Sequence, residues 1–386
     1  MLAFYLSFKE IWRNRGRFFL FSLVFALITI LVLFIAALAQ GLATANKQFL
    51  EKLDAELLVF EKNTNTSIPT SQIGRSKLPA IHNVQGVAAA GSIGFSTATL
   101  IPPNNQPDLD VALVGVDPNS PGSPPVLAGR ELLTTQANEV VIDGNIAGRT
   151  HIKVGDTITL KTIQGTKEKF YNLKVVGQTD GRQYLFQPAI FLPYRTWDTI
   201  RPQGASTGDA LVEITSNIVA VKLTNPADLQ TVATRIQSEV PSVQVVDINT
   251  AILSLPGYTV QQQTLDSQQF FTLLIGILVI GGFFQIQMLQ KVPLIGVLKA
   301  IGASNFIIAH SVVLQIVLVS SFGVLLGSLI TFILALGMPP NVPILFSGNS
   351  ILMAVLSLLL IGPLGGLVSV RQAIKVEPLI ALGLSS

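Results

Sequence analysis

Four long apolar runs dominate the hydropathy pattern of this 386-residue chain. They cover residues 18–42, 268–289, 306–338 and 351–370, and none of them contains a Lys, Arg, Asp or Glu residue. A helix needs about 20 residues to cross the roughly 30 Å hydrocarbon core of a bilayer. Each run therefore predicts one transmembrane helix. The first run is also too long for the apolar segment of about 7–15 residues in a cleaved signal peptide.

Residues 43–267, between the first and second runs, follow a different pattern. Short runs of alternating or β-branched residues are separated there by Gly, Pro, Asn and Asp, as in strands joined by turns. These runs cover residues 111–114, 139–142, 157–160, 171–176 and 189–192. Two stretches, 43–56 and 226–239, have helical spacing instead. The predicted fold class is therefore membrane α-helical, with four transmembrane helices, plus a mixed α+β, mainly β, extracytoplasmic domain.

Positive charge gathers on one side of the predicted membrane. Eight cations flank the spans on that side, against only Glu10 and Glu377. The cations are Lys9, Arg13, Arg15, Arg17, Lys291, Lys299, Arg371 and Lys375. Because cytoplasmic flanks retain Lys and Arg, we expect both termini in the cytoplasm.

The same topology assigns the remaining segments. Residues 43–267 and a short loop at 339–350 are expected outside, and a tail at 371–386 inside. Residues 1–17 combine apolar and basic side chains as an amphipathic helix on the inner leaflet would, although a simple positive anchor fits equally well.

The composition excludes several function classes. Only 12% of the residues are charged and the mean hydropathy is +0.56, whereas a soluble protein is about 25% charged. There is no cysteine, and the three histidines have no partner at metal-ligand or triad spacing, so we predict neither a metal site nor catalytic residues. The phosphate-binding pattern Gly-x-x-x-x-Gly-Lys-Ser/Thr is absent as well, and no basic patch with interleaved aromatic residues indicates nucleic acid.

Residues 290–305, here called the coupling segment, are unusually apolar for a connection in water. The apolar residues are Leu294, Ile295, Val297, Leu298 and Ile301, and the cations at their rim are Lys291 and Lys299. On a short helix ended by Gly302 they would form an apolar face that another protein covers. The alternative is a helix that lies against the bilayer interface.

Three motifs resemble the FtsX-like (MacB-type) ABC transporter permeases. They are Ile295–Ser304, Arg371–Leu382, and the set formed by Gly129–Leu132, Glu139–Asp143 and Ile152–Thr157. Within that family Phe8–Ile11, Arg15–Phe18 and Gln290–Pro293 look most similar to permeases of the HrtB type, which export haem. Many members carry an acidic residue where Pro293 and Leu294 stand here.

The resemblance implies a type VII ABC system in a bacterial cytoplasmic membrane. Two copies of the permease would pair with two cytoplasmic ATPase subunits, which bind ATP and Mg²⁺. Nucleotide-driven dimerisation of the ATPase would push on residues 294–301, the mechanism called mechanotransmission. The cargo would be a hydrophobic or amphiphilic compound, with haem as one candidate.

Three residues could contact such a cargo. Phe34 and Phe49 could offer ring faces, and Glu51 an oxygen ligand or a polar clamp. In the plainer alternative, Phe34 packs against lipid or a helix and Glu51 is solvated.

Two other function classes stay open. A non-transporting mechanotransmitter would control an extracytoplasmic partner such as a cell-wall hydrolase or a sensor kinase. A membrane-anchored enzyme would need a site within residues 43–267, where the sequence indicates none. Separately, Gly323 and Gly327 form a Gly-x-x-x-Gly pair that predicts close packing of the third span against another helix.

Overall fold

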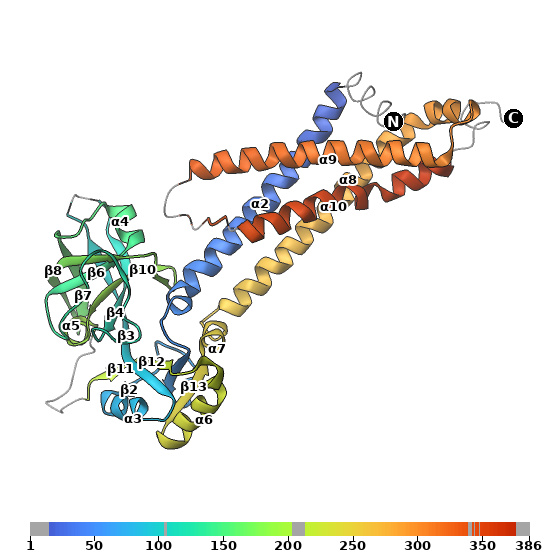
Figure 1. Cartoon of the computed structure of the whole chain (residues 1–386). Helices are drawn as coiled ribbons and strands as arrows, with labels where there is room; N and C mark the ends of the chain where they lie inside the picture. Colours follow the sequence, from blue (N-terminus) through green and yellow to red (C-terminus); the bar gives the residue numbers. More distant parts are fainter. Residues whose placement is uncertain are drawn as a thin grey trace. The chain divides into compact units, whose positions relative to one another are not determined.

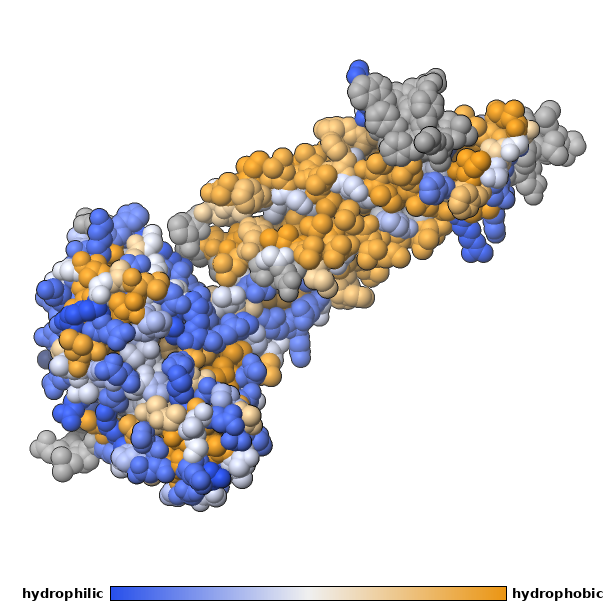
Figure 2. Space-filling view, in the orientation of Figure 1, coloured by the Kyte–Doolittle hydropathy of each residue, from blue (hydrophilic) through white to orange (hydrophobic). Residues whose placement is uncertain are grey.

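Four long helices dominate one of the two compact units of the computed structural model, which describes residues 15–103, 106–202, 213–338, 342, 344–346 and 348–375. We call residues 1–41 and 262–386 the helical unit and residues 42–261 the sheet domain. The long helices are α2 (Arg15–Glu51), α8 (Tyr258–Ala300), α9 (Asn305–Leu336) and α10 (Gly348–Lys375) (Figure 1). Residues 42–51 of α2 and 258–261 of α8 belong to the sheet domain. All four are long and apolar enough to cross a membrane. Hydrophobic side chains cover most of the visible face of the helical unit (Figure 2).

The second span and the coupling segment form a single helix. Helix α8 has 43 residues and is about 65 Å long at 1.5 Å per residue, roughly twice the thickness of a bilayer core. The sequence predicts separate elements at 268–289 and 290–305, but the helix continues because its terminating glycine comes only at Gly302. Pro293 lies inside the helix, where it lacks an N–H to donate to the carbonyl of Leu289.

Aromatic side chains of α2 pack into the core of the helical unit. Phe21 lies edge-to-face against Phe283 of α8, with ring centroids 4.1 Å apart, and Phe25 lies against Phe284. The prediction of close packing at the Gly-x-x-x-Gly pair is confirmed. A Cβ atom on Gly327 would meet the carbonyl oxygen of Ala26 on α2 at 2.6 Å, so α9 can approach α2 this closely only without a side chain there.

The sheet domain contains one large sheet, part of which closes on itself. Its paired strands are β1 (Leu57–Glu61), β3 (Val87–Ile101), β4 (Leu109–Val116), β5 (Val126–Gly129), β6 (Glu139–Asp143), β7 (Thr157–Gln164), β8 (Lys167–Thr179), β9 (Gln183–Tyr184), β10 (Gln187–Pro193), β12 (Ile218–Leu223) and β13 (Val243–Asp247). The pairings run β3-β4-β10-β6-β8-β7 and return to β3, so these six strands form a ring. A closed ring has no unpaired edge strand along its circumference.

Each predicted strand has its counterpart in this ring. Residues 111–114, 139–142, 157–160, 171–176 and 189–192 lie in β4, β6, β7, β8 and β10. Alternate side chains, such as Leu113, Ile158 and Ile190, are fully buried in one cluster, and the side chains between them, such as Val114 and Phe191, are buried in another. Strands β12, β1 and β13 extend the sheet beyond the ring and pack on α6 (Leu229–Glu239), the helix predicted at 226–239.

Shorter elements complete the sheet domain. They are β2 (Ile73–Gly74), η1 (Arg75–Lys77), α3 (Leu78–His82), α4 (Gly144–Thr150), α5 (Tyr194–Ile200), β11 (Thr215–Ser216), η2 (Pro226–Asp228) and α7 (Ile248–Leu253). The last turns of α2 supply Phe49 and Leu50 to the sheet domain's largest apolar cluster. The predicted fold class, four membrane helices with a mainly β domain, is confirmed.

Candidate functional site

One face of the coupling segment is attached to the neighbouring helices. Lys291, Ile295 and Lys299 recur every four residues and so share that face. The Lys291 ammonium donates to Oε1 of Gln315 on α9 at 2.7 Å, and the Lys299 ammonium donates to the carbonyl oxygen of Ile374 on α10 at 2.5 Å. Ile295 is buried between them in a cluster with residues of α8, α9 and α10. The sequence predicts both lysines at the rim of a partner contact, whereas these hydrogen bonds hold the segment within the chain.

The opposite face of the coupling segment is apolar and exposed. Leu294, Val297 and Ile301 follow the spacing of one helix face, and their exposed fractions are 53%, 43% and 77%. Leu298 is half-buried beside them. Of the predicted contact residues, these four could therefore reach a partner, while Ile295 could not.

The end of the coupling segment is fixed by backbone geometry. Gly302 adopts φ +96°, and the N–H groups of Gly302 and Ala303 donate to the carbonyl oxygens of Lys299 and Leu298. This is the hydrogen-bond pattern of a Schellman C-cap, which requires a left-handed residue at the glycine position. The predicted stop at Gly302 is confirmed, and the side chain of Ser304 caps the start of α9 directly afterwards.

A small polar cavity lies under the attached face. It has a volume of about 10 Å³ and is lined by Gln287, Lys291, Gln315 and Ser369, among others. The hydroxyl of Ser369, a residue that is 1% exposed, finds no hydrogen-bond partner among the described residues. The cavity is about the size of one water molecule, which would satisfy this hydroxyl.

The three predicted cargo residues have different environments. Phe34 is half-buried on α2, and Glu51 is exposed and forms an ion pair with Lys47 at 3.0 Å. Phe49 is 0% exposed, and its ring stacks on Phe191 at 6.1 Å. Its interior position assigns Phe49 to the core of the sheet domain, so it cannot offer a ring face to cargo. Seventeen residues of helix, a rise of about 26 Å, separate Phe34 from Glu51, so the two cannot hold one small molecule together.

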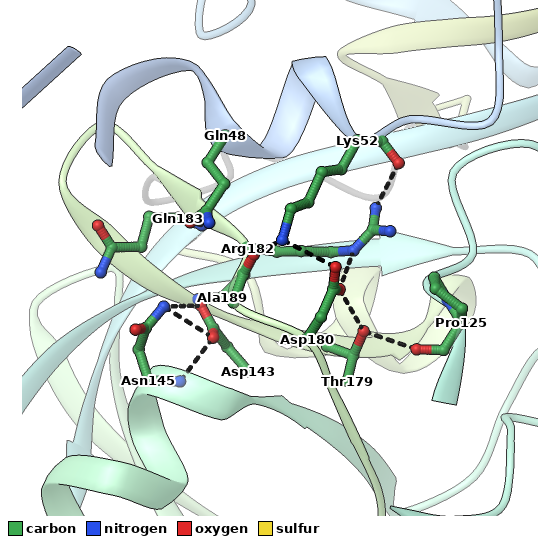
Figure 3. A network of polar contacts seen from close by, with 11 residues as sticks. Gln48, Lys52, Pro125, Asp143, Asn145, Thr179, Asp180, Arg182, Gln183 and Ala189 are labelled. Atoms are coloured by element: carbon green, nitrogen blue, oxygen red, sulfur yellow. Dashed lines mark hydrogen bonds and ion pairs between the residues drawn. The ribbon is translucent and has the colours of Figure 1, made fainter. Parts of the chain in front are cut away.

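A polar network surrounds the C-terminal end of α2 within the sheet domain (Figure 3). The Lys52 ammonium donates to Oδ2 of Asp180 at 2.8 Å and to the carbonyl oxygen of Gly181 at 2.7 Å. Arg182 donates from Nε to Oδ1 of Asp180 and from Nη1 to the carbonyl oxygen of Lys52, both at 2.8 Å. The guanidinium thus satisfies a backbone carbonyl at the helix end and orients the carboxylate that holds Lys52.

Further contacts extend this network along the last turns of α2. The backbone N–H of Gln183 donates to Oε1 of Gln48 at 3.2 Å, and the N–H of Phe186 donates to the carbonyl oxygen of Ala45 at 3.2 Å. No local sequence pattern indicates this site. Asp180-Gly181-Arg182 is typical of an exposed turn, and its partner Lys52 lies 128 residues earlier in the chain than Asp180.

Two carboxylates near the helix end have shifted pKa values. Partial burial acts to raise the pKa of Asp180, but the hydrogen bonds from Lys52 and Arg182 outweigh it and the pKa is lowered. Burial raises the pKa of Asp143, and hydrogen bonds from Asn145 offset it only in part. Asp143 is the N-cap of α4, where it accepts from the backbone N–H of Asn145 at 2.7 Å.

An open cleft of about 660 Å³ lies beside the network. Its walls combine the charged residues Lys52, Asp54, Glu131, Arg182 and Lys222 with residues of the loop 119–125. The Lys222 ammonium is paired with Asp54 at 2.6 Å, so the cleft already carries its own counter-charge. Among the described residues no group of three His, Asp or Glu side chains could hold a metal ion.

Two protein-family models match this chain. The model of the MacB-like periplasmic core domain matches residues 18–239, and the model of the FtsX-like permease C-terminal region matches residues 269–378. The first match covers more than half of the chain, and the second covers most of the helices that follow the sheet domain.

Two full-length relatives are both named "Putative hemin transport system permease protein HrtB". The one from Staphylococcus haemolyticus is 27% identical over 378 residues and the one from Staphylococcus epidermidis is 23% identical. Each alignment covers 98% of this chain and 99% of the relative.

Two solved structures resemble part of the chain. The extracellular domain of the noncanonic ABC-type transporter YknZ from Gram-positive bacteria is 11% identical, with a TM-score of 0.35. The match covers 49% of the present protein and 98% of the YknZ domain. The periplasmic region of MacB from Actinobacillus actinomycetemcomitans is 14% identical, with a TM-score of 0.35, and covers 55% of this chain and 92% of that chain.

Proposed function

This chain belongs to the FtsX-like (MacB-type) family of ABC transporter permeases, and we propose that it couples ATP hydrolysis by a separate ATPase to export of a hydrophobic or amphiphilic compound. It is a membrane protein with an extracytoplasmic domain, and membership of the family implies a cytoplasmic ATPase partner. The proposal adds that both termini and the coupling segment lie in the cytoplasm. It also adds a type VII assembly of two permease copies with two ATPase subunits in a bacterial cytoplasmic membrane.

The observation that carries the proposal is the exposed apolar face of Leu294, Val297 and Ile301. The uncharged span of α8 ends near Leu289, and the remaining residues to Ala300 add about 16 Å of helix, which a bilayer core of about 30 Å does not need. Apolar side chains that reach beyond the core gain free energy when another protein covers them. Because Lys291 and Lys299 tie the segment to α9 and α10, a push on its exposed face would move the three helices together.

Haem is the cargo candidate that the names of the relatives support. It is an amphiphile, which suits a helical unit with an apolar surface. Phe34 is the predicted cargo residue that remains in the proposal, as an aromatic contact on α2. Glu51 is the polar candidate, and its ion pair with Lys47 would have to open for it to bind cargo.

The test is co-purification with the ATPase encoded beside this permease, followed by ATPase rates in nanodiscs with and without haem and a panel of amphiphiles. Stimulation by one compound would support transport and name the cargo. Ile301→Asp should abolish ATPase association, because it places a charge at the most exposed residue of the apolar face. Leu127→Asp is the matched control, because Leu127 is 72% exposed in the sheet domain. This variant should bind the ATPase normally.

A non-transporting mechanotransmitter is the second candidate, and the network at the end of α2 favours it. Lys52, Asp180 and Arg182 fix the last turns of this helix to the sheet domain, so a displacement of these turns would move the strands with them. An ATPase that needs the coupling segment but ignores every amphiphile, together with a protein captured by the sheet domain, would favour this candidate. No ATPase association at all would refute both.

A further inference from the structure

Helices α2 and α9 cross at small residues, and a groove opens beside the crossing. Gly323 of α9 faces Ser22 and Phe25 of α2, and Gly327 faces Ala26 and Thr29. The Ser22 hydroxyl also donates to the carbonyl oxygen of Val319 at 3.5 Å. Helices that touch at a crossing diverge on either side of it, so side chains there do not fill the space between them.

The groove lies toward the N-terminal end of α2 and has a volume of about 520 Å³. Its apolar walls are Phe18, Phe19, Leu318, Val319, Phe322 and Leu325. Several of these side chains are widely exposed, with Phe19 at 57% and Leu325 at 70%. Both helices are candidate membrane spans, so an exposed groove between them would be within reach of lipid.

Positive charge lies at one end of this groove. Arg15, three residues before the apolar run begins, is exposed and lines the groove. The Lys291 ammonium lies 5.7 Å from the ring centroid of Phe18, but it does not line the groove and donates to Gln315 instead. The groove thus combines a long apolar surface with one cation, Arg15, at its end.

We propose that this groove binds one anionic phospholipid, with its acyl chain along the apolar walls and its phosphate at Arg15. A zwitterionic lipid would fill the apolar walls equally well but would carry no net charge for Arg15 to attract. Basic residues at the end of a span attract anionic headgroups by about 1 kcal/mol each, which corresponds to a roughly fivefold preference. The site requires neither the ATPase nor a cargo, so its test is independent of the proposed transport.

The experiment is native mass spectrometry of the delipidated full-length permease, titrated with phosphatidylglycerol or phosphatidylcholine of the same chain length. We expect the first phosphatidylglycerol to bind about fivefold more tightly than phosphatidylcholine, and Arg15→Gln to remove that difference. Arg371→Gln is the matched control, because Arg371 is an exposed cation on α10 outside the groove. A preference that survives Arg15→Gln, or that Arg371→Gln removes equally, would overturn the proposal.

A second variant separates lipid from other occupants of the groove. Ser321→Trp should fill the groove from α9 and remove one bound lipid per chain. If it leaves the lipid count unchanged but dissociates a dimer, a second copy occupies the groove and the proposal is overturned. If deletion of residues 2–12 adds one bound lipid per chain, the N-terminal segment is the normal occupant, and the proposal is likewise overturned.

Discussion

Removal of the Arg182 guanidinium should loosen the end of α2 from the sheet domain. Arg182→Met keeps the apolar stem of a side chain that is 6% exposed but removes its donors to Asp180 and to the carbonyl oxygen of Lys52. Leaving a buried acceptor without its donor costs about 1–3 kcal/mol. Asp180 keeps its ion pair with Lys52 and is 32% exposed, so solvent offsets part of the cost of losing the hydrogen bond from Arg182. We therefore expect a total destabilisation of about 2–3 kcal/mol.

The assay uses the fluorescence of Trp197, which is 1% exposed in the sheet domain. The sequence has two tryptophans, Trp12 and Trp197, so a Trp12→Phe background makes the signal specific to this domain. A change of 1 kcal/mol shifts Tm by about 2–4 °C in a domain of about 150–250 residues. Arg182→Met should therefore lower the Tm of the sheet domain by about 4–12 °C.

The matched control is Arg130→Met in the same domain. The Arg130 side chain is 45% exposed, and its ion pair is with Glu139. Exposed ion pairs contribute less than about 1 kcal/mol, so Tm should fall by no more than about 4 °C. Equal shifts in the two variants would refute the argument that buried hydrogen bonds at the helix end, rather than charge alone, hold α2 in place.

Three further outcomes follow from the described contacts. Partial burial acts to raise the pKa of Asp180, but the hydrogen bonds from Lys52 and Arg182 lower it, so the ionised carboxylate stabilises the fold. The difference in unfolding free energy between the wild type and Asp180→Asn, measured with urea, should hold at neutral pH and shrink as the pH falls below the ordinary pKa of 3.8. A difference that grows at low pH would contradict this prediction. Phe49→Ala should lower the free energy of unfolding by about 3–5 kcal/mol in the same urea assay. The loss should exceed that of Phe34→Ala, since only Phe49 is fully buried, and equal losses would contradict the assignment of Phe49 to the core. Gly327→Leu should lower the Tm of the detergent-solubilised protein, because overpacking destabilises the fold by about 1–3 kcal/mol or more. Gly282→Leu should leave the Tm unchanged, because a Cβ atom at Gly282 meets no atom within 4 Å.

Local sequence patterns were sufficient for the four spans and for five of the strands. Uncharged runs predicted four membrane helices because a bilayer requires a long apolar helix wherever the chain crosses it. Alternating runs predicted five of the six ring strands, all but β3, since a strand with one buried face repeats every two residues. The stop at Gly302 and the close approach at Gly327 followed equally directly, because each depends on a residue without a side chain.

Pairing between distant residues was decided only by the tertiary structure. No periodic pattern in the sequence indicates that Lys52 contacts Asp180 and Arg182. The pairing of β3 with β7, which closes the ring, is not indicated by any local pattern either. In the sequence, nothing distinguishes Phe49 from other aromatic residues near a span, but in the structure the sheet domain encloses its side chain. Periodicity reports which face of an element is buried, but a contact also depends on where the partner element packs. The sequence therefore determined the four spans, five strands of the ring and the stop of the coupling segment at Gly302, while the tertiary structure decided which of their side chains are enclosed and which remain for a partner.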